Sequence, residues 1–450
     1  MALAPYYSVP SLKSSYWNGR VETMPREELD ALHLRRVQAM IRYTYENIPM
    51  YKELYGEANT CPEDIQTLQD YIDRVPTIDK RDVVTFQQLR PPFGDTVVPG
   101  SEDYMTLRYT TSGSTGIPLQ EVGFYTDPLN MWTWGWWAWG IRPKDIFYFA
   151  FPFGTFMGFW SAYFDALVFG AQVITGGGVD TKTRIKQIVE LEPTVLISTP
   201  TYALHMAEVA REMGIDPAKS SIKFVSTAGE PGPAVPSIRR ALEEAWGATA
   251  IDMYGISETW TAHSLHCPVR LNGIHLNENI CYPLVVDENG RPVPEGEVGE
   301  LVLTSYSAVL TPYVKYRTHD LVRWYKGVCD CGRTWVYLDG GVLGRTDNMI
   351  VVKGTNVYPT AVQNVLAADA DVSENLEIHI TSEGLGDQVQ IKVEARPQVG
   401  GESYTRLGQK LEEALREKIG VRLPVEVLAP GTLPRYEMKA KRVFDHRQAR

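Results

Sequence analysis

Between residues 145 and 254 the chain alternates short apolar runs with segments of helical spacing, and this alternation leaves few folds open to it. The apolar runs lie at 146–151, 171–175, 195–198, 224–227 and 249–253, and the helical segments at 159–169, 181–190, 201–213 and 234–246. Alternation of this kind predicts a parallel sheet with helices on its faces. Ligands bind such sheets at the carboxyl ends of the strands, which makes three following segments candidate binding loops: Ser198–Thr201, Ala228–Pro231 and Tyr254–Thr259.

The flanking segments predict further units. Residues 21–60 and 64–74 have helical spacing and residues 77–80 start another helix, so we expect a helical cap on the first domain. Residues 267–339 are rich in strand-like runs, with a hairpin expected at 284–293 around an Asn-Gly turn. Beyond Arg345 the pattern changes to strand 349–353, helix 359–368, strands 376–381 and 388–395, helix 404–419 and strand 425–427.

These patterns predict an α/β protein with two domains. Residues 1–345 would form a large N-terminal domain, in which parallel-rich sheets flanked by helices join a β-barrel-like region. Residues 346–450 would form a small, mobile α+β C-terminal domain, with the boundary at Arg345–Asp347.

Bulk composition excludes several classes of function. A net charge of −11 argues against broad binding to nucleic acid or to an anionic membrane. Five cysteines in 450 residues do not suggest a disulfide framework, and the N-terminus lacks the pattern of a signal peptide. The most apolar stretch, 132–169, is broken by charged residues, proline and glycines, so it is not expected to span a bilayer. We expect a cytoplasmic protein.

One loop has the composition of a phosphate-binding site. Residues Thr110–Ile117 contain five hydroxyls, two glycines and no charge, between strand-like runs at 105–109 and 119–124. Glycines and consecutive N–H groups can cradle an anion, although a Gly/Ser surface linker would have the same composition. It is not a Walker loop, because Ile117 follows Gly116 where that motif needs lysine.

Tryptophans crowd a helix expected at 127–140. Five of them lie between Trp132 and Trp139, a density typical of a core or a flat apolar wall. A stacking platform for nucleic acid is disfavoured, because few cations accompany them.

The chain resembles the adenylate-forming superfamily of acyl-CoA synthetases, and within it the phenylacetate–CoA ligase-like branch. The resemblance spans about residues 105–447 and rests on six segments in order: Thr110–Gly116, Ala228–Pro231, Asp252–Glu258, Tyr316–Asp320, Gly344–Pro359 and Leu433–Lys441. It implies an ATP-dependent aryl or arylacetic acid–CoA ligase that forms an acyl-adenylate and releases AMP and pyrophosphate. Two alternatives remain open: a stand-alone adenylation enzyme that passes the acyl group to a carrier protein or an amine, and a non-enzymatic nucleotide-binding relative.

The resemblance also implies roles for a nucleotide site in the large domain. The phosphates of ATP would bind at Thr111, Ser112, Gly113, Ser114, Thr115 and Gly116. Adenine would lie along Gly229, Glu230 and Pro231 and stack on Tyr254, with Asp252 and Gly255 in the same site. Asp320 would take the ribose hydroxyls, Arg345 the ribose or α-phosphate, and Glu258 the Mg²⁺. Glu258 as a solvated turn residue and Asp320 as a cap are the plainer interpretations.

The small domain would bring the catalytic lysine, which the resemblance places at Lys439 with Lys441 as its rival. Lys439 could also be a lysine of a charged tail. Thr111 and Glu258 would join it in catalysis, Asp347 would be the hinge, and Gly354 would let pantetheine pass. Attack of a carboxylate on the α-phosphate brings two anions together, so catalysis needs preorganised cations such as an ammonium group and Mg²⁺.

The acid would bind beside the nucleotide. The resemblance places Phe151, Phe156, Trp160, Ala228 and Thr259 around it, and the flat aromatic faces favour an aryl acid, although a plain aromatic core is the alternative. His263 and His266 could meet a ring substituent or could be surface histidines.

Four residues form a candidate zinc set, Cys267, His275, Cys329 and Cys331. A Cys-x-Cys-Gly turn presents two thiolates together, and Cys₃His is an accepted composition for structural zinc. Free cysteines in a core, or His266 as the imidazole ligand, are the alternatives, and Cys61 and Cys281 stay unassigned. The expected partners are the acid, ATP and CoA, with no nucleic acid or membrane; a homodimer and a carrier protein are left open.

Overall fold

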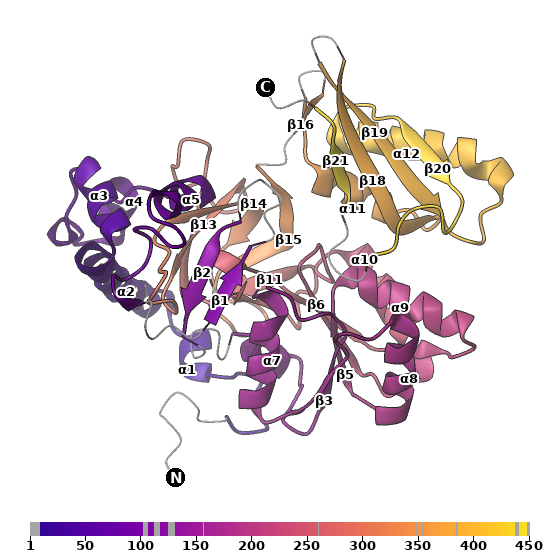
Figure 1. Cartoon of the computed structure of the whole chain (residues 1–450), viewed down its shortest axis with the longest axis horizontal. Helices are drawn as coiled ribbons and strands as arrows, with labels where there is room; N and C mark the ends of the chain where they lie inside the picture. The colour runs from indigo at the N-terminus through magenta and orange to yellow at the C-terminus, as the bar shows by residue number, and fades with distance from the viewer. Residues whose placement is uncertain are drawn as a thin grey trace.

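The computed structural model describes residues 10–101, 107–111, 118–124, 131–155, 157–259, 261–346, 350–352, 355–383, 386–436 and 441–447. A broad body built from the N-terminal three quarters of the chain lies beside a smaller C-terminal lobe (Figure 1). No helix in the described part of the chain combines the length and the apolar character needed to cross a bilayer.

The predicted parallel sheet is confirmed. Its strand order is β4-β3-β5-β6-β7, and every neighbouring pair is parallel. The strands are β3 (Ile146–Phe149), β4 (Gln172–Thr175), β5 (Val195–Ser198), β6 (Phe224–Ala228) and β7 (Thr249–Met253). They alternate with α7 (Gly158–Phe169), α8 (Thr181–Leu191), α9 (Pro200–Glu212) and α10 (Pro236–Trp246).

Both faces of this sheet are buried, which explains its continuous apolar runs. Phe147 and Phe149 point to one face and pack in a core with Trp136, because alternate strand residues face opposite sides. Tyr148 points to the other face and packs with Tyr202 of α9.

The tryptophan-rich helix α6 (Thr133–Ala138) covers the first of these faces and is shorter than the expected 127–140. Residues 125–130 lie outside the described residues, and the left-handed Gly140 ends the helical turn that follows. Four tryptophans in and beside this helix are buried: Trp132, Trp134, Trp136 and Trp137. The interpretation of the tryptophan-rich segment as core is therefore confirmed.

A six-stranded antiparallel sheet, in the order β10-β11-β15-β14-β13-β12, forms the predicted barrel-like region. Its strands are β10 (Ser264–His266), β11 (Gly273–Leu276), β12 (Cys281–Val286), β13 (Val298–Ser305), β14 (Tyr316–Tyr325) and β15 (Tyr337–Arg345). The hairpin expected at 284–293 is confirmed. The chain turns at Gly290, Val286 bridges Pro292, and the Val293 N–H donates to the Val285 carbonyl at 3.0 Å, while β12 also pairs with β13.

The N-terminal helices cap this sheet as predicted. They are α1 (Gly19–Glu22), α2 (Arg26–Asn47), α3 (Pro49–Glu57), α4 (Leu68–Arg74) and α5 (Lys80–Leu89). Side chains of Thr67 and Asp79 accept the first backbone N–H groups of α4 and α5. The helix expected from residue 64 therefore begins at Leu68. Their apolar faces pack on Tyr282 of β12 and Tyr316 of β14.

The hairpin that flanks the hydroxyl-rich loop is confirmed. Strand β1 (Leu107–Thr110) pairs antiparallel with β2 (Gln120–Gly123). The backbone and Oγ1 of Thr111 continue the pairing to Leu119. Residues 112–117 lie outside the described residues.

The C-terminal lobe has its own core. Its elements are β16 (Ile350–Val352), β17 (Thr355–Val357), α11 (Pro359–Ala367), β18 (Val372–Glu383), β19 (Gly386–Ala395), α12 (Tyr404–Ile419), β20 (Val425–Leu428) and β21 (Val443–Asp445). The sheet order is β20-β19-β18-β21, and Leu411 and Leu415 of α12 share its core with Ile378 and Ile391. The domain boundary at residues 345–346 stays a prediction, and Asp347 lies outside the described residues.

Candidate active site

Three side chains from different strands meet at the carboxyl end of the parallel sheet. Tyr254 follows β7 directly, while Asp320 and Arg345 are paired partners on β14 and β15. The Tyr254 hydroxyl donates to Asp320 Oδ2 at 2.5 Å, and Arg345 Nη1 donates to Oδ1 at 2.9 Å. Burial, followed by the neighbouring carboxylate, raises the pKa of Tyr254 well above its ordinary value, so the phenol stays a donor. Three predicted nucleotide-site residues are thus brought together.

His319 precedes Asp320 in β14, and sequence reasoning assigned it no role. Its φ of +62° is rare for a residue with a side chain and marks a locally strained segment. Its Nδ1 lies 3.0 Å from Thr346 Oγ1, and its bond to Asp79 holds the pKa of that carboxyl at about 2. The only signal in the sequence was its place beside Asp320 in the Tyr316–Asp320 segment.

The loop after β6 carries the residues expected to line adenine. Gly229 has a φ of +88°, a conformation that favours glycine. The Glu230 side chain is only 2% exposed and accepts from Thr201 Oγ1 at 2.5 Å. Asp252 lies behind the loop and accepts from the Ala234 N–H at 3.0 Å, and burial raises its pKa to about 7. Asp252 thus holds the loop's backbone. Gly255 lies in the short strand β8 (Gly255–Ile256), which pairs with β9 (Thr261–Ala262).

Gly232→Ala is expected to disturb this loop. A Cβ at Gly232 would lie 2.5 Å from Asp252 Oδ1, and the buried carboxylate has little room to withdraw. We expect a loss of about 1–3 kcal/mol in the free energy of unfolding, measured in urea, together with weaker ATP binding. Gly56→Ala is the matched control: its Cβ meets nothing within 4 Å, and alanine within helix α3 should be neutral or stabilising. Equal effects of the two substitutions would contradict the packing argument.

A second carboxylate lies near the predicted magnesium ligand. Glu258 belongs to a short 3₁₀ turn, Ser257–Thr259, and accepts a bond from Tyr316. Glu121 of β2 is 1% exposed and accepts from the Tyr313 hydroxyl at 2.7 Å. Its pKa is raised, first by burial and then by the charge of Glu258. Carboxylate oxygen is the ligand that Mg²⁺ prefers, and Glu258 is close enough to Glu121 to affect its pKa, so the residues fit that ion.

The residues expected around the acid differ in how deeply they are buried. Phe151 is 2% exposed and stacks on Phe159 with ring centroids 3.9 Å apart, so it belongs to the aromatic core that was the alternative. Trp160 is half-buried, and its ring lies 4.5 Å from that of Phe153, which is also half-buried. Ala228 ends β6 next to the adenine loop. Phe156 lies outside the described residues.

Both histidines near the site are buried, so their interpretation as surface residues is wrong. His263 Nδ1 lies 3.0 Å from Thr259 Oγ1, and its ring contacts Tyr254 edge-on. His266 accepts from the Asp252 N–H and donates to the Leu271 carbonyl. Because both ring nitrogens of His266 are engaged, it is wrong as the alternative zinc ligand.

Several other predictions fall outside the described residues, and the structure does not test them: Ser112, Gly113, Ser114, Thr115, Gly116, Asp347, Gly354 and Lys439. Thr111 is described, and its Oγ1 accepts from the Leu119 N–H at 3.0 Å. The rival lysine, Lys441, is also described, and its Nζ lies 4.9 Å from the centre of the Phe444 ring.

The four candidate zinc ligands converge. Their donor atoms, from Cys267, His275, Cys329 and Cys331, all lie within 4.8 Å of one another. Cys267 Sγ and Cys329 Sγ are 3.8 Å apart, which is about the spacing of two thiolates on one tetrahedral zinc ion. His275 Nδ1 lies 3.1 Å from the Trp335 carbonyl, which directs Nε2 toward Cys331 Sγ at 3.4 Å. The donor set therefore fits a closed, structural zinc site.

Comparison with known proteins agrees with this geometry. Residues 22–314 match the AMP-binding enzyme family, and residues 354–447 match the AMP-binding enzyme C-terminal domain. The phenylacetate-coenzyme A ligase of Thermus thermophilus is 33% identical over 95% of this chain and 99% of its own length. A crystal structure of 2-hydroxyisobutyryl-CoA ligase in the postadenylation state, with 2-HIB-AMP, is 31% identical and superposes with a TM-score of 0.91, covering 98% of this chain and 95% of that one. The same ligase in its thioesterification state, at 31% identity and covering 99% and 95%, superposes with a TM-score of 0.74.

The chain therefore belongs to the AMP-binding enzyme family. Within that family it is an adenylate-forming ligase, an enzyme of the phenylacetate–CoA ligase-like branch.

Proposed function

We propose that this chain is an AMP-forming ligase that joins an aryl or arylacetic acid to coenzyme A through an acyl-adenylate. The observation that carries the proposal is the Asp320 carboxylate, held by Tyr254 and Arg345 at the carboxyl end of the parallel sheet. A carboxylate fixed in this way can accept both hydroxyls of a ribose, since each hydroxyl is a donor. The arginine beside it can face the α-phosphate.

In the first half-reaction, each group of residues would have a separate role. The loop at 111–116 would receive the β- and γ-phosphates, and the loop at 229–231 would line the adenine. Lys439 would lie between the attacking carboxylate and the α-phosphate, where an ammonium group offsets the repulsion of two anions. Glu258, with Glu121 behind it, would hold Mg²⁺. Bound Mg²⁺ supplies neutralisation of the charge that develops on the departing pyrophosphate.

The second half-reaction is proposed to use CoA. The relative with 33% identity is named as a coenzyme A ligase, and it matches nearly its whole length. Whole-chain superposition is better with the postadenylation state of 2-hydroxyisobutyryl-CoA ligase than with its thioesterification state. We infer that the described arrangement is the one in which the acyl-adenylate is formed and held, and that a turn at Asp347 would then open the pantetheine path past Gly354. Transfer to a carrier protein is not favoured.

We propose an aryl or arylacetic acid as the substrate. Two observations support this class: the similarity to a phenylacetate-coenzyme A ligase, and the half-buried aromatic rings of Trp160 and Phe153. The cluster of Cys267, His275, Cys329 and Cys331 is proposed to hold structural zinc, which would tie β10 and β11 to the turn before β15. A homodimer and a cytoplasmic location stay predictions.

The experiment that tests the function is exchange of labelled pyrophosphate into ATP over a panel of acids. The panel contains phenylacetate, substituted benzoates, 2-hydroxyisobutyrate and an amino acid. We expect exchange that depends on Mg²⁺ and on an aryl acid, followed by CoA-dependent thioester formation. Exchange with 2-hydroxyisobutyrate alone would overturn the acid class, and exchange with no acid would overturn the function.

A further inference from the structure

A buried ion pair joins the C-terminal lobe to the adenine loop of the large domain. Arg442 Nη1 lies 3.2 Å from Glu230 Oε2, and Arg442 Nη2 donates to Thr201 Oγ1 at 2.6 Å. Thr201 in turn donates to the same Glu230 oxygen, which closes a three-membered network. The side chains of Arg442 and Glu230 are 14% and 2% exposed, so this is not an ordinary surface ion pair.

Arg442 is a rigid part of its lobe. Its carbonyl accepts from the Ile378 N–H of β18 at 2.7 Å, and the next residue begins β21, which pairs in parallel with the same strand. Its partners are equally fixed, because Thr201 lies in the first turn of α9 and Glu230 follows β6. The pair therefore fixes the position of the C-terminal lobe relative to the adenine loop.

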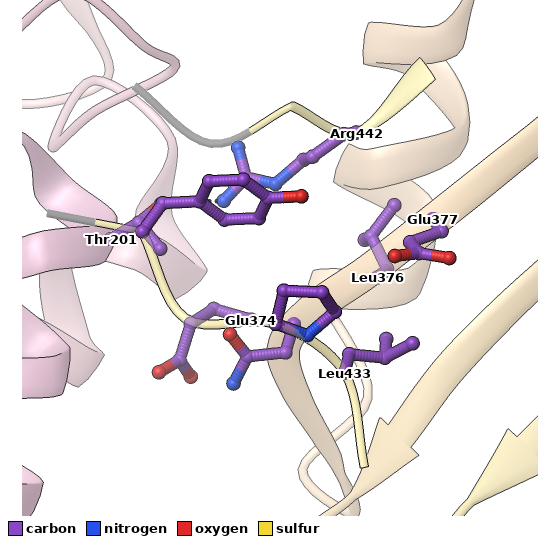
Figure 2. A pocket seen from close by; sticks show the side chains of 9 residues that line it. Thr201, Glu374, Leu376, Glu377, Leu433 and Arg442 are labelled. Atoms are coloured by element: carbon purple, nitrogen blue, oxygen red, sulfur yellow. Dashed lines mark hydrogen bonds between the residues drawn. The ribbon is translucent and has the colours of Figure 1, made fainter. Parts of the chain in front are cut away.

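The interface around the pair is polar and incompletely packed. A pocket lies between the lobes, with Thr201 on one side and Glu374, Leu376 and Leu433 of the C-terminal lobe on the other (Figure 2). A second ionic contact, between Arg435 Nε and Glu208 Oε2 of α9, is looser at 4.0 Å. An interface of this kind can separate, and the pair at Arg442 is the tighter of these two ionic contacts that hold it in this arrangement.

We propose that Arg442 is a positioning residue that holds the lobe closed for adenylation and releases it for thioester formation. Lys439 lies three residues before Arg442, and three residues of chain span at most about 10 Å, so anchoring Arg442 at the adenine loop would limit how far the lysine can move from that loop. Arg442 itself touches none of the reacting atoms. This inference rests on the proposed two-step function, and it adds the contact that selects between the two steps.

The test separates the half-reactions. Arg442→Ala should lower pyrophosphate exchange by about tenfold or more, because the ion pair that joins the lobe to Glu230 is removed. It should leave thioester formation from synthetic acyl-adenylate and CoA within about twofold, which a general structural defect would not do. Arg442→Lys should restore part of the exchange, and Thr201→Val should give an intermediate loss. Arg416→Ala, which removes an exposed ion pair on α12, is the control and should change neither step.

A distance measurement keeps the test independent of activity. Fluorescent unnatural amino acids replace Lys219 of the large domain and Lys418 of the lobe, both exposed, and energy transfer reports their separation. Without any substrate, Arg442→Ala should lose the population at the distance of the described arrangement, whereas Arg416→Ala should keep it. Unchanged distances, or equal losses in both half-reactions, would overturn the inference. Absence of exchange by the unaltered enzyme, together with the distance change, would refute the proposed function and leave the contact standing.

Discussion

Replacing Lys439 by alanine is expected to abolish adenylation, lowering ATP–pyrophosphate exchange by about 10²–10³-fold while ATP still binds. The reason is electrostatic. The attacking carboxylate and the α-phosphate repel each other, and a preorganised ammonium group between them costs no reorganisation during the reaction. Binding of ATP depends on other groups, so titration calorimetry should give a dissociation constant close to that of the unaltered enzyme. Thioester formation from synthetic acyl-adenylate should survive.

Lys441→Ala is the matched comparison. Its ammonium group lies 4.9 Å from the centre of the Phe444 ring, within its own lobe, where a cation–π contact accounts for its position. We therefore expect near-normal exchange from this variant. The reverse result, with Lys439→Ala active and Lys441→Ala inactive, would move the catalytic role to Lys441.

Cys331→Ser is expected to remove the metal from the Cys/His cluster. The bound zinc of the purified protein should fall from about one equivalent to less than about a tenth, because the set has four ligands and no spare. The midpoint of thermal unfolding should fall by about 5 °C or more, since the ion joins segments that are far apart in the sequence. Metal content is measured by plasma mass spectrometry and unfolding by calorimetry.

Cys61→Ser controls for the loss of a thiol as such. Cys61 lies in the helical cap, where its thiol donates to Asp64, and it has no part in the cluster. It should leave the metal content unchanged. A protein that contains no zinc before mutation, or that keeps it in Cys331→Ser, would contradict the assignment.

The parallel sheet could be predicted because its inner strands are buried on both faces, which gives runs such as Val195–Ser198, whereas the edge strand β4 is partly exposed. The start of α5 could also be predicted, because Asp79 caps it within the expected segment 77–80. The start of α4 was predicted at residue 64, four residues before the one that Thr67 caps. The Asn-Gly turn also predicted the local hairpin at 284–293, which the structure contains. The additional pairing of β12 with β13 could not be predicted, because it joins segments that no local turn connects.

The candidate site shows a similar division. Motifs contiguous in sequence named Asp320, Tyr254 and Arg345, and the structure brings those three together. Glu121, His319 and Arg442 were missed, because their significance depends on contacts between segments far apart in the chain. Glu121 sits in an ordinary strand, and nothing in its surrounding sequence indicates that Glu258 lies close to it.

The most direct test of the account is to mix the enzyme with ATP, Mg²⁺ and its acid in the absence of CoA, quench the mixture, and identify the products by mass spectrometry. The account predicts acyl-AMP and pyrophosphate in amounts stoichiometric with the enzyme, followed by conversion of the acyl-AMP to acyl-CoA and AMP when CoA is added. Formation of ADP and phosphate, or of thioester without any acyl-AMP, would contradict it.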